Sequence, residues 1–403
     1  MSGPLDGIRV LDLSRVMAGP WSGQILADLG ADVIKVERPG VGDDTRRWGP
    51  PFLPGDEGRS DQNSGYYLSV NRGKRSVLAD LGTSEGCDLV RALAARSDIL
   101  LENYKVDTLA RFGLDYAALR KTCPRLIYCS ITGFGQTGPR RSEPAYDFVI
   151  QAMGGLMSIT GAPDDEPGGG PQKVGLPIVD IMTGMYATVA VLAALERRHQ
   201  TDAGDHIDLA MFDVHAAFLA NQAMNHLLTG RVPARMGNRH PNIQPQNVYR
   251  CRDGYLALAV GNDGQFIALC SVLALDALGT DPRFATNAAR VRNLPALEAK
   301  LNLAFEKNDA LAWERSLVDA GVPAGRINSV DQVFADPQIV AREMLRHQPH
   351  PRGGEVPTVV SPMRFADAPL AFDRPAPMLG EHHAQILAEL GWDATQERNR
   401  AAD

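Results

Sequence analysis

Short apolar runs alternate with helical patterns through the N-terminal part of the chain. The runs that predict strands are Gly7–Leu13, Ala31–Glu37, Tyr66–Val70, Ser76–Leu81, Asp98–Asn103, Leu126–Thr132 and His206–Met211. The patterns that predict helices between them are Gln24–Leu29, Ser84–Ala95 with Ser84 as its cap, Val106–Phe112 and Tyr146–Met153. Because such alternation is typical of parallel sheets covered on both faces, we predict an α/β fold with a doubly wound, mainly parallel, Rossmann-like sheet.

The longest nearly uncharged apolar stretch is Pro177–Arg198, PIVDIMTGMYATVAVLAALERR. It is rich in Ala, Leu and Met and ends in charged residues, so we predict a buried core helix over Met182–Arg198. Its apolar part, Ile181–Leu195, is shorter than the ~20 residues that a membrane span needs. A further helical pattern covers Phe212–Leu228.

The pattern changes after residue 225. Gly230–Pro245 is irregular and indicates a linker, and a predicted strand at Gly254–Val260 opens a helix-rich region. Its helical patterns are Gln265–Leu275, Val291–Phe305 and Ala310–Ala320. Val333–Glu343 and the polar Pro349–Pro362 region follow, and a C-terminal helix is predicted at Glu381–Leu390. We therefore predict a large domain from residues 1–225 plus 331–403 and a smaller α+β domain from residues 226–330.

Two polar places in the large domain could meet a ligand. Ligands of open α/β sheets bind outside the carboxyl ends of the strands, which directs attention to Arg15–Gly19 and Glu37–Arg38. No G-x-G-x-x-G motif is present, so a dinucleotide fingerprint is not supported. The basic run NRGKR offers Lys74 and Arg75 as phosphate ligands, although a solvated charge run has the same pattern.

Composition argues against several classes of function. The net charge of −7 provides no basic excess to bind nucleic acid or an anionic membrane. The N-terminus lacks a signal-peptide pattern, and the five cysteines are scattered without C-x-x-C spacing. Neither the cysteines nor the histidines have the spacing of a metal site. We therefore expect a cytoplasmic protein with reduced thiols, no metal, no nucleic-acid partner and no membrane partner.

Asp180 precedes the predicted core helix and admits two interpretations. As an N-cap, its carboxylate would accept an unpaired backbone N–H of the first helical turn. As a half-buried carboxylate at a helix N-terminus beside a glycine-rich loop, it could instead attack an electrophile. The residue pattern alone favours the cap.

Several motifs in constant order carry a resemblance to a known family. They are VLDLSRVMAGP, LADLGADVIKVERPGVGDDTR, NRGKRSV, LLENY, YDFVIQAMGG, the Asp180 segment and LGEHHAQIL. Together they resemble the family III acyl-CoA transferases, which include formyl-CoA transferase and carnitine-CoA transferase. The resemblance implies that Asp180 is a covalent nucleophile, that CoA and acyl-CoA are substrates with no tightly bound cofactor, and that two chains interlock as a homodimer.

The resemblance also assigns CoA-binding positions. They are Met17, Ala18, Arg38, Leu81, Asn103, Tyr104 and Arg111. A guanidinium such as that of Arg38 can hold a phosphate through two parallel hydrogen bonds. Plainer interpretations exist: Arg38 as a surface arginine, Arg111 as a helix-end charge, and Leu81 and Met17 as core residues.

A carboxylate nucleophile explains how such an enzyme works. Attack on an acyl-CoA gives a mixed aspartyl–acyl anhydride and CoA thiolate, and the thiolate returns to form an aspartyl-CoA thioester. An incoming acid then opens that thioester, and CoA leaves on the new acyl group. Backbone N–H donors near Asp180 are expected to stabilise the tetrahedral centres, and a closing loop to exclude water.

Tyr146 separates the transferase from its alternatives. The similar racemase branch, alpha-methylacyl-CoA racemase, carries histidine at this position, whereas a phenol is a poor base at neutral pH. We place Tyr146 and Asp147 with the CoA-binding residues. A 2-methylacyl-CoA racemase, a CoA-activated dehydratase or decarboxylase-associated partner, and a non-catalytic acyl-CoA-binding protein remain as alternatives.

The substrate is indicated only weakly. GDDTRRWGPPF resembles branches that use succinyl-CoA or another dicarboxylyl-CoA, with Arg46 or Arg47 binding the second carboxylate. His240 and Asn242 could line the acyl pocket, or form a turn, and the segment around them lacks the glycine run that shields the intermediate in related transferases.

Overall fold

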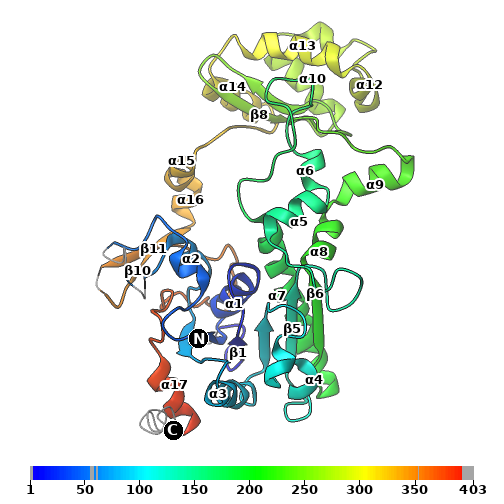
Figure 1. Ribbon diagram of the computed structural model, residues 1–403. Helices are drawn as coiled ribbons and strands as arrows, with labels where there is room; N and C mark the ends of the chain where they lie inside the picture. Colours follow the sequence, from blue (N-terminus) through cyan, green and yellow to red (C-terminus); the bar gives the residue numbers. More distant parts are fainter. Residues whose placement is uncertain (1–2, 55–58, 60–61, 353, 393–403) are drawn as a thin grey trace. The chain divides into compact units, whose positions relative to one another are not determined.

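Six of the predicted strands form one parallel sheet in the order β3-β2-β1-β4-β5-β6 (Figure 1). The strands are β1 (Arg9–Asp12), β2 (Asp32–Glu37), β3 (Arg75–Leu78), β4 (Ile99–Glu102), β5 (Ile127–Thr132) and β6 (His206–Ala210). Every neighbouring pair is parallel, which confirms the predicted α/β class and mainly parallel sheet. The order reverses between β1 and β4, and open α/β sheets bind their ligands at such a switch point.

The computed structural model describes residues 3–54, 59, 62–352 and 354–392. These residues divide into two compact units, which we treat separately. Unit 1 contains Met1–Gly154, Val174–Ala223 and Gln338–Asp403, and unit 2 contains Gly155–Lys173 and Met224–Pro337. The glycine-rich segment ahead of the core helix thus belongs to the same unit as the residues predicted to form the small domain.

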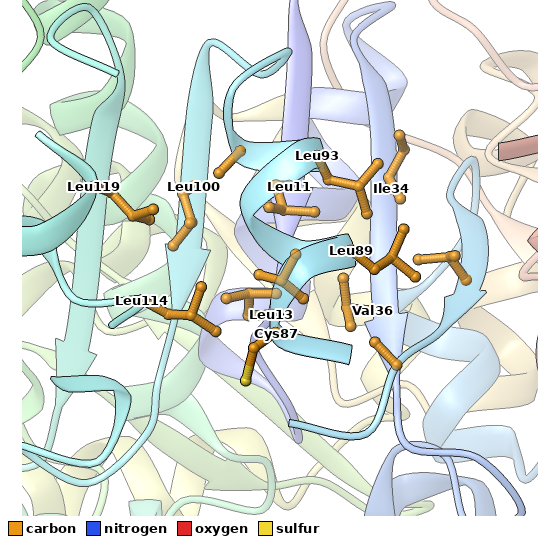
Figure 2. Close-up of a cluster of buried hydrophobic side chains, with 14 of the residues drawn as sticks. Leu11, Leu13, Ile34, Val36, Cys87, Leu89, Leu93, Leu100, Leu114 and Leu119 are labelled. Atoms are coloured by element: carbon orange, nitrogen blue, oxygen red, sulfur yellow. The ribbon is translucent and has the colours of Figure 1, made fainter. Parts of the chain in front are cut away.

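Each strand of the sheet buries side chains on both faces. In β1, Val10 enters a cluster with helices α1 (Ala18–Asp28) and α7 (Ile178–Thr201). The adjacent Leu11 enters a cluster with helices α3 (Ser84–Ala94) and α17 (His383–Leu390). Ile99 and Leu100 of β4 divide in the same way, as the period-two geometry of a strand requires. Figure 2 shows the second cluster, where Leu89 and Leu93 of α3 lie over the sheet. Burial on both faces explains the nearly continuous apolar runs in the sequence.

The remaining elements of unit 1 surround this sheet. They are α1 (Ala18–Asp28), η1 (Asp44–Arg47), α2 (Gly65–Val70), α3 (Ser84–Ala94), η2 (Leu109–Phe112), α4 (Tyr116–Leu119), α5 (Asp147–Met153), α7 (Ile178–Thr201), α8 (Met211–Phe218), α17 (His383–Leu390), and the hairpin strands β10 (Leu345–Pro349) and β11 (Glu355–Val359). Helices α9 (Ala220–Thr229) and α16 (Pro337–Ala341) contain two of the four points where the chain passes between the units.

Helix α7 packs closely on α1 through small residues. A Cβ atom at Gly184 would lie 2.6 Å from the carbonyl oxygen of Ala18, so only glycine fits there. One turn later, the hydroxyls of Ser22 and Thr188 are 3.0 Å apart. This contact fixes the first turns of α7, which carry Asp180, against the start of α1.

By length and composition, α7 could cross a membrane: its 24 residues include a window of mean hydropathy 1.9. The prediction that this segment is too short was wrong, because the helix extends beyond Ile181–Leu195 at both ends. Core helices of soluble proteins meet the same criterion, and Ala187, Val191 and Leu195 pack against the sheet.

Unit 2 has its own sheet and core. Three antiparallel strands, β7 (Gln246–Arg250), β8 (Tyr255–Ala259) and β9 (Ala324–Arg326), lie in the order β7-β8-β9. Its helices are α6 (Leu156–Ile159), α10 (Asp263–Val272), α11 (Asp276–Gly279), α12 (Asn287–Arg292), α13 (Leu294–Phe305), α14 (Ala310–Asp319) and α15 (Val330–Ala335). Phe266, Leu297 and Phe305 are fully buried between these helices and the sheet.

The prediction of a strand at Tyr66–Val70 was wrong, because this segment is helix α2. Ser64 caps it, its hydroxyl accepting the backbone N–H of Tyr67 at 3.1 Å. A short apolar run does not by itself distinguish a strand from one buried helical turn. The cap, a serine directly before the run, was the available signal.

Other differences concern element ends and polar strands. Thr83, not Ser84, caps α3, and the helix expected at Val106–Phe112 is reduced to the short turn η2. Strands β7, β9, β10 and β11 were missed. They are short, and β7 and β10 are mostly polar, so they lack the apolar run on which strand prediction depends.

Candidate active site

Asp180 lies in the first turn of α7, but it is not the helix cap. The N-cap residue is Pro177, which has no side chain that can cap. The cap is supplied from α5: the carboxylate of Asp147 accepts the backbone N–H of Val179 at 2.7 Å and that of Asp180 at 3.2 Å. The N-cap interpretation of Asp180 was therefore wrong. Among the described residues, its carboxylate has no hydrogen-bond partner.

The surroundings of Asp180 favour its protonated form. Burial, followed by the nearby charge of Asp147, raises the pKa of Asp180 to about 7. A helix N-terminus normally lowers the pKa of a carboxyl group, but here Asp147 already occupies the free N–H groups. Gln151 donates to the other oxygen of Asp147 and holds it in place. The result is a carboxylate that is more basic, and hence a better nucleophile once ionised, than an exposed aspartate.

Two aromatic residues near Asp180 escaped the sequence analysis. Tyr66 of α2 has its pKa raised to about 12 by burial and by the charges of Asp180, Asp147 and Asp43. The ring of Trp48 meets that of Tyr66 edge-on, with centroids 5.3 Å apart. Tyr66 was hidden by the wrong strand assignment. Trp48 lies in the motif GDDTRRWGPPF, whose aromatic residue was the available signal.

Tyr146 lies at the N-cap position of α5, directly before Asp147. Its side chain is 63% exposed, and it makes no side-chain capping hydrogen bond. The residue that discriminates transferases from racemases in the sequence analysis is therefore next to the pair Asp147–Asp180 and open at the surface of unit 1.

A buried histidine packs against the end of α5. His215 of α8 is fully buried, and neither ring nitrogen has a hydrogen-bond partner among the described residues. Burial lowers its pKa, while the charge of Asp147 acts in the opposite direction. A Cβ atom at Gly154 would lie 2.3 Å from its Nδ1 atom, so the end of α5 needs glycine beside a neutral imidazole. No sequence signal indicated this residue.

A cavity of about 320 Å³ opens at the carboxyl ends of β1 to β4. It is lined by Arg15, Lys35, Val36, Glu37, Arg38, Val41, Gly42, Asp43, Asp44, Ala79, Asp80, Leu81, Gly82, Tyr104, Thr108 and Phe112. Three of the predicted CoA-binding residues, Arg38, Leu81 and Tyr104, thus line one cavity although they lie far apart in the sequence.

Two exposed arginines line the cavity, and they differ in whether the guanidinium already has an ion-pair partner. Arg15 pairs with Asp44 at 3.2 Å and lies over the ring of Tyr104 at 5.3 Å. Arg38 is exposed at the end of β2, and its guanidinium has no ion-pair partner in the described part of the chain. Arg38 is therefore the side chain best placed to bind a phosphate at this cavity.

Of the other predicted CoA-binding residues, Tyr146 and Asp147 lie beside Asp180, and the remaining four are not on the cavity wall. Asn103 brackets Arg15, its side chain accepting the backbone N–H at 2.8 Å and donating to the carbonyl at 2.6 Å. Arg111 is exposed on η2. Met17 and Ala18 are buried at the start of α1, beside the α7 turn that follows Asp180.

Two buried ion pairs lie in this part of unit 1, and the residues of the first pair also line the cavity. Lys35 bonds Asp43 at 2.9 Å, and Lys74 bonds Asp12 at 2.8 Å. Burial lowers the pKa of Lys74 to about 8, and its ammonium also donates to the carbonyl of Pro20. The hypothesis that Lys74 binds phosphate was therefore wrong, because its donors are used inside the protein.

The neighbouring arginines are committed as well. Arg75 pairs with Asp32 and Glu389, both at 2.6 Å, so it is not a free phosphate ligand. Arg46 is fully buried and forms two hydrogen bonds with Glu37, at 2.8 and 2.7 Å. It therefore cannot meet a substrate carboxylate. The adjacent Arg47 is exposed and has no ion-pair partner among the described residues.

Comparison with known proteins decides the family. The family model described as CoA-transferase family III matches residues 5–383. The chain belongs to CoA-transferase family III. A relative from Agrobacterium fabrum, "Succinate--glutarate CoA-transferase", is 51% identical over 96% of each chain. The "Succinyl-CoA:glutarate CoA-transferase" of Mus musculus is 39% identical over 96% of this chain and 86% of its own.

The solved structures agree with the family. A "CAIB/BAIF family protein from Brucella suis" is 50% identical and superimposes with a TM-score of 0.84 over 97% of this chain and 100% of that one. This family III protein is thus a CoA-transferase, which moves CoA from an acyl-CoA to a free carboxylic acid. The transferase prediction is confirmed. In the described part of the chain, no group of three or more His, Cys, Asp or Glu side chains could hold a metal ion.

Proposed function

We propose that this enzyme exchanges CoA between succinyl-CoA and a free dicarboxylate of the glutarate class, through covalent intermediates on Asp180. The observation that carries the proposal is the Asp180 carboxylate, which has a raised pKa and no hydrogen-bond partner within the described residues. The names of the relatives from Agrobacterium fabrum and Mus musculus support the choice of substrates.

The chemistry proceeds in four balanced steps. The ionised Asp180 attacks the thioester carbonyl, which gives an aspartyl–succinyl anhydride and CoA thiolate. The thiolate attacks the aspartyl carbon, so succinate leaves and an aspartyl-CoA thioester forms. The carboxylate of glutarate attacks that carbon and expels the thiolate again, and the thiolate takes the glutaryl group from the second anhydride. Asp180 is restored, and the free energy of one thioester is carried into the other.

CoA binds, in this proposal, at the cavity formed by the ends of β1 to β4. Arg38 holds a phosphate group, while Leu81 and Tyr104 provide apolar and aromatic surface. Arg15 keeps its place over Tyr104 and adds a second positive charge.

The distal carboxylate of the substrate binds Arg47. Arg46 is excluded by its bonds to Glu37, whereas Arg47 is exposed and directly precedes Trp48, which touches Tyr66. Arg47→Gln should raise KM for succinyl-CoA and glutarate about tenfold, since a charge-assisted hydrogen bond contributes about 1.5–3 kcal/mol, and leave a monocarboxylate acceptor unaffected. Arg197→Gln, at the other end of α7, is the matched control.

The decisive experiment looks for the covalent adduct. After incubation with succinyl-CoA, mass spectrometry of peptides should find a CoA-sized addition on Asp180, and Asp180→Asn should abolish both the adduct and transfer to glutarate. Normal turnover by a correctly folded Asp180→Asn variant would exclude the mechanism. Exchange of an α-proton with deuterium, without an acceptor acid, would support a racemase instead.

A second copy of the chain covers an apolar surface of unit 1. The packed helices α5 and α7 and their approaches expose Tyr146, Phe148, Val149, Met153, Leu176, Met185, Tyr186 and Val189. Such a surface is typical of an interface between subunits. We therefore retain the proposal of an interlocked homodimer. Val189→Arg should shift the sedimentation coefficient to that of a monomer, whereas Val318→Arg, on α14, should not.

We propose that the protein is cytoplasmic and has neither a nucleic-acid nor a membrane partner. The net charge of −7 supports the absence of a nucleic-acid or anionic-membrane partner. Fractionation of cells that produce the full chain tests the location.

A further inference from the structure

The motif LGEHHAQIL of the sequence analysis has no role in the chemistry above, yet it closes an edge of the central sheet. Strand β3 is an edge strand, with β2 on one side only. On its other side, the backbone N–H of Ser76 donates to Nδ1 of His382 at 3.3 Å, and the N–H of Leu78 donates to Nδ1 of His383 at 3.2 Å. The backbone N–H of His382 returns a hydrogen bond to the carbonyl of Ser76 at 3.0 Å.

Residues 377–383, which we name the C-terminal clasp, make further contacts at this edge. The N–H of Gly380 donates to the hydroxyl of Ser76 at 2.9 Å, and that hydroxyl donates to Glu37 at 2.6 Å. A Cβ atom at Gly380 would lie 2.8 Å from the Leu78 side chain, and its φ of +68° also favours glycine. The carbonyl of Pro377 accepts from Arg46 at 3.1 Å.

The clasp lies directly behind the proposed CoA site. Strand β3 ends at Leu78, and the next four residues, Ala79 to Gly82, line the cavity, as does Glu37. The two histidines are thus the side chains that bond the backbone of β3 just before it becomes the cavity wall. A shift of either histidine would therefore move Leu81 through the backbone of β3, without either histidine touching a ligand.

We propose that His382 and His383 are positioning residues for CoA binding, and that they act by accepting the strand N–H groups at Nδ1. A neutral ring accepts the strand N–H at Nδ1, whereas a protonated ring carries a proton on both nitrogens and can accept at neither. Protonation of His382 therefore releases the N–H of Ser76 at the outer edge of β3 and weakens CoA binding. The inference rests on the proposed CoA site.

The charges around the clasp have opposing effects. Burial lowers the pKa of His382, and Arg374 and Arg75 act in the same direction, whereas Glu381 and Asp32 raise it. Arg75 is itself neutralised by Asp32 and by Glu389 of α17. Because its pKa is lowered, the ring of His382 stays neutral above about pH 6.5, the ordinary histidine pKa. The clasp therefore stays closed in that range.

The test compares asparagine with leucine at both histidines. The amide oxygen of asparagine can accept in place of Nδ1 but does not titrate, whereas leucine cannot accept. The dissociation constant of CoA is measured by calorimetry at about pH 8 and at a series of values descending below the ordinary histidine pKa, because the pKa of His382 is lowered. CoA titrates identically with every variant, so differences between variants report the protein.

We expect wild-type affinity to fall by about fivefold more than that of H382N/H383N on acidification, which corresponds to one hydrogen bond of about 1 kcal/mol. H382L/H383L should bind CoA weakly at both pH values. His347→Asn, at an exposed position of β10, should behave as the wild type. An identical pH dependence in the wild type and H382N/H383N would overturn the inference, even if the leucine variant did not fold.

Two further measurements separate this inference from the proposed CoA site. If Arg38→Ala leaves CoA affinity unchanged, the CoA site itself is wrong. If Arg38→Ala weakens binding, while H382L/H383L speeds amide hydrogen exchange at Ser76 and Leu78 without changing CoA affinity, the site stands and the positioning role fails. Faster exchange together with weaker binding supports both.

Discussion

The carboxylate of Asp147 accepts the backbone N–H of Asp180 at 3.2 Å, so one aspartate caps the helix in whose first turn the other lies. The same proximity allows the charge of Asp147 to raise the pKa of Asp180. One side chain therefore positions the proposed nucleophile and adds to the basicity that burial gives it.

Asp147→Asn should separate these two effects. Asparagine keeps an oxygen that can cap α7 but removes the charge, so the pKa of Asp180 falls below about 7. The acidic limb of the kcat–pH profile should move to lower pH, while thermal stability changes little. An unshifted limb would mean that Asp180 does not control it. Asp309→Asn, in unit 2, is the control.

Asp180→Asn should stabilise the fold at high pH. The pKa of Asp180 is about 7 in the folded protein, against an ordinary value of 3.8, so the folded state binds the proton more tightly than the unfolded chain does. Stability is therefore lost as pH rises through this window. Above it, the variant should be more stable by about 1–3 kcal/mol, because each pKa unit corresponds to about 1.4 kcal/mol at most.

Denaturant titrations at several pH values measure this difference. It should shrink as the pH falls and vanish below the ordinary pKa of 3.8, where both states become protonated. A constant difference at every pH would instead indicate a packing effect. The measurement needs no substrate and is independent of the catalytic test.

Gly184→Ala should separate α1 from α7. The new Cβ atom would lie 2.6 Å from the carbonyl oxygen of Ala18, and because that neighbour is backbone, the helices must shift. We expect a loss of about 1–3 kcal/mol in unfolding free energy, typical of overpacking. Gly175→Ala, where no atom lies within 4 Å, should cost much less.

Lys74→Met should destabilise the protein strongly, because it leaves the fully buried Asp12 without its ion-pair partner. Removal of one member of a buried pair costs about 3–5 kcal/mol. The double variant Asp12→Leu/Lys74→Met should lose less than the sum of the single variants. Purely additive losses would contradict coupling. Lys121→Met, at the surface, is the control.

The sequence was sufficient for the parallel sheet because its strands are buried on both faces and read as apolar runs. It failed at Tyr66–Val70, where a single buried helical turn has the same composition as a strand. It failed again at β10, whose polar residues Arg346 and His347 hide the pairing with β11. Those strands are defined by tertiary pairing, which leaves little local pattern.

The candidate site, like the fold, could be predicted from the sequence only in part. Arg38 could be found because it follows a strand end, where ligands of open α/β sheets bind, whereas Leu81 and Tyr104 were found only through the family resemblance. The cap from Asp147 could not be found, since it depends on how α5 and α7 pack. Nor could one tell from the sequence that Arg46 is buried whereas Arg47 is exposed, because two adjacent arginines form no pattern that shows which one faces the protein interior.

The buried ion pair Lys35–Asp43, whose residues line the cavity, gives it an unequal response to ionic strength. Dissolved ions screen charges that face water, and they screen enclosed pairs such as Lys35–Asp43 much less. Raising the salt concentration should therefore weaken CoA capture at the exposed Arg38 while the cavity keeps its shape. The enzyme should therefore lose affinity for CoA at salt concentrations that leave its structure intact.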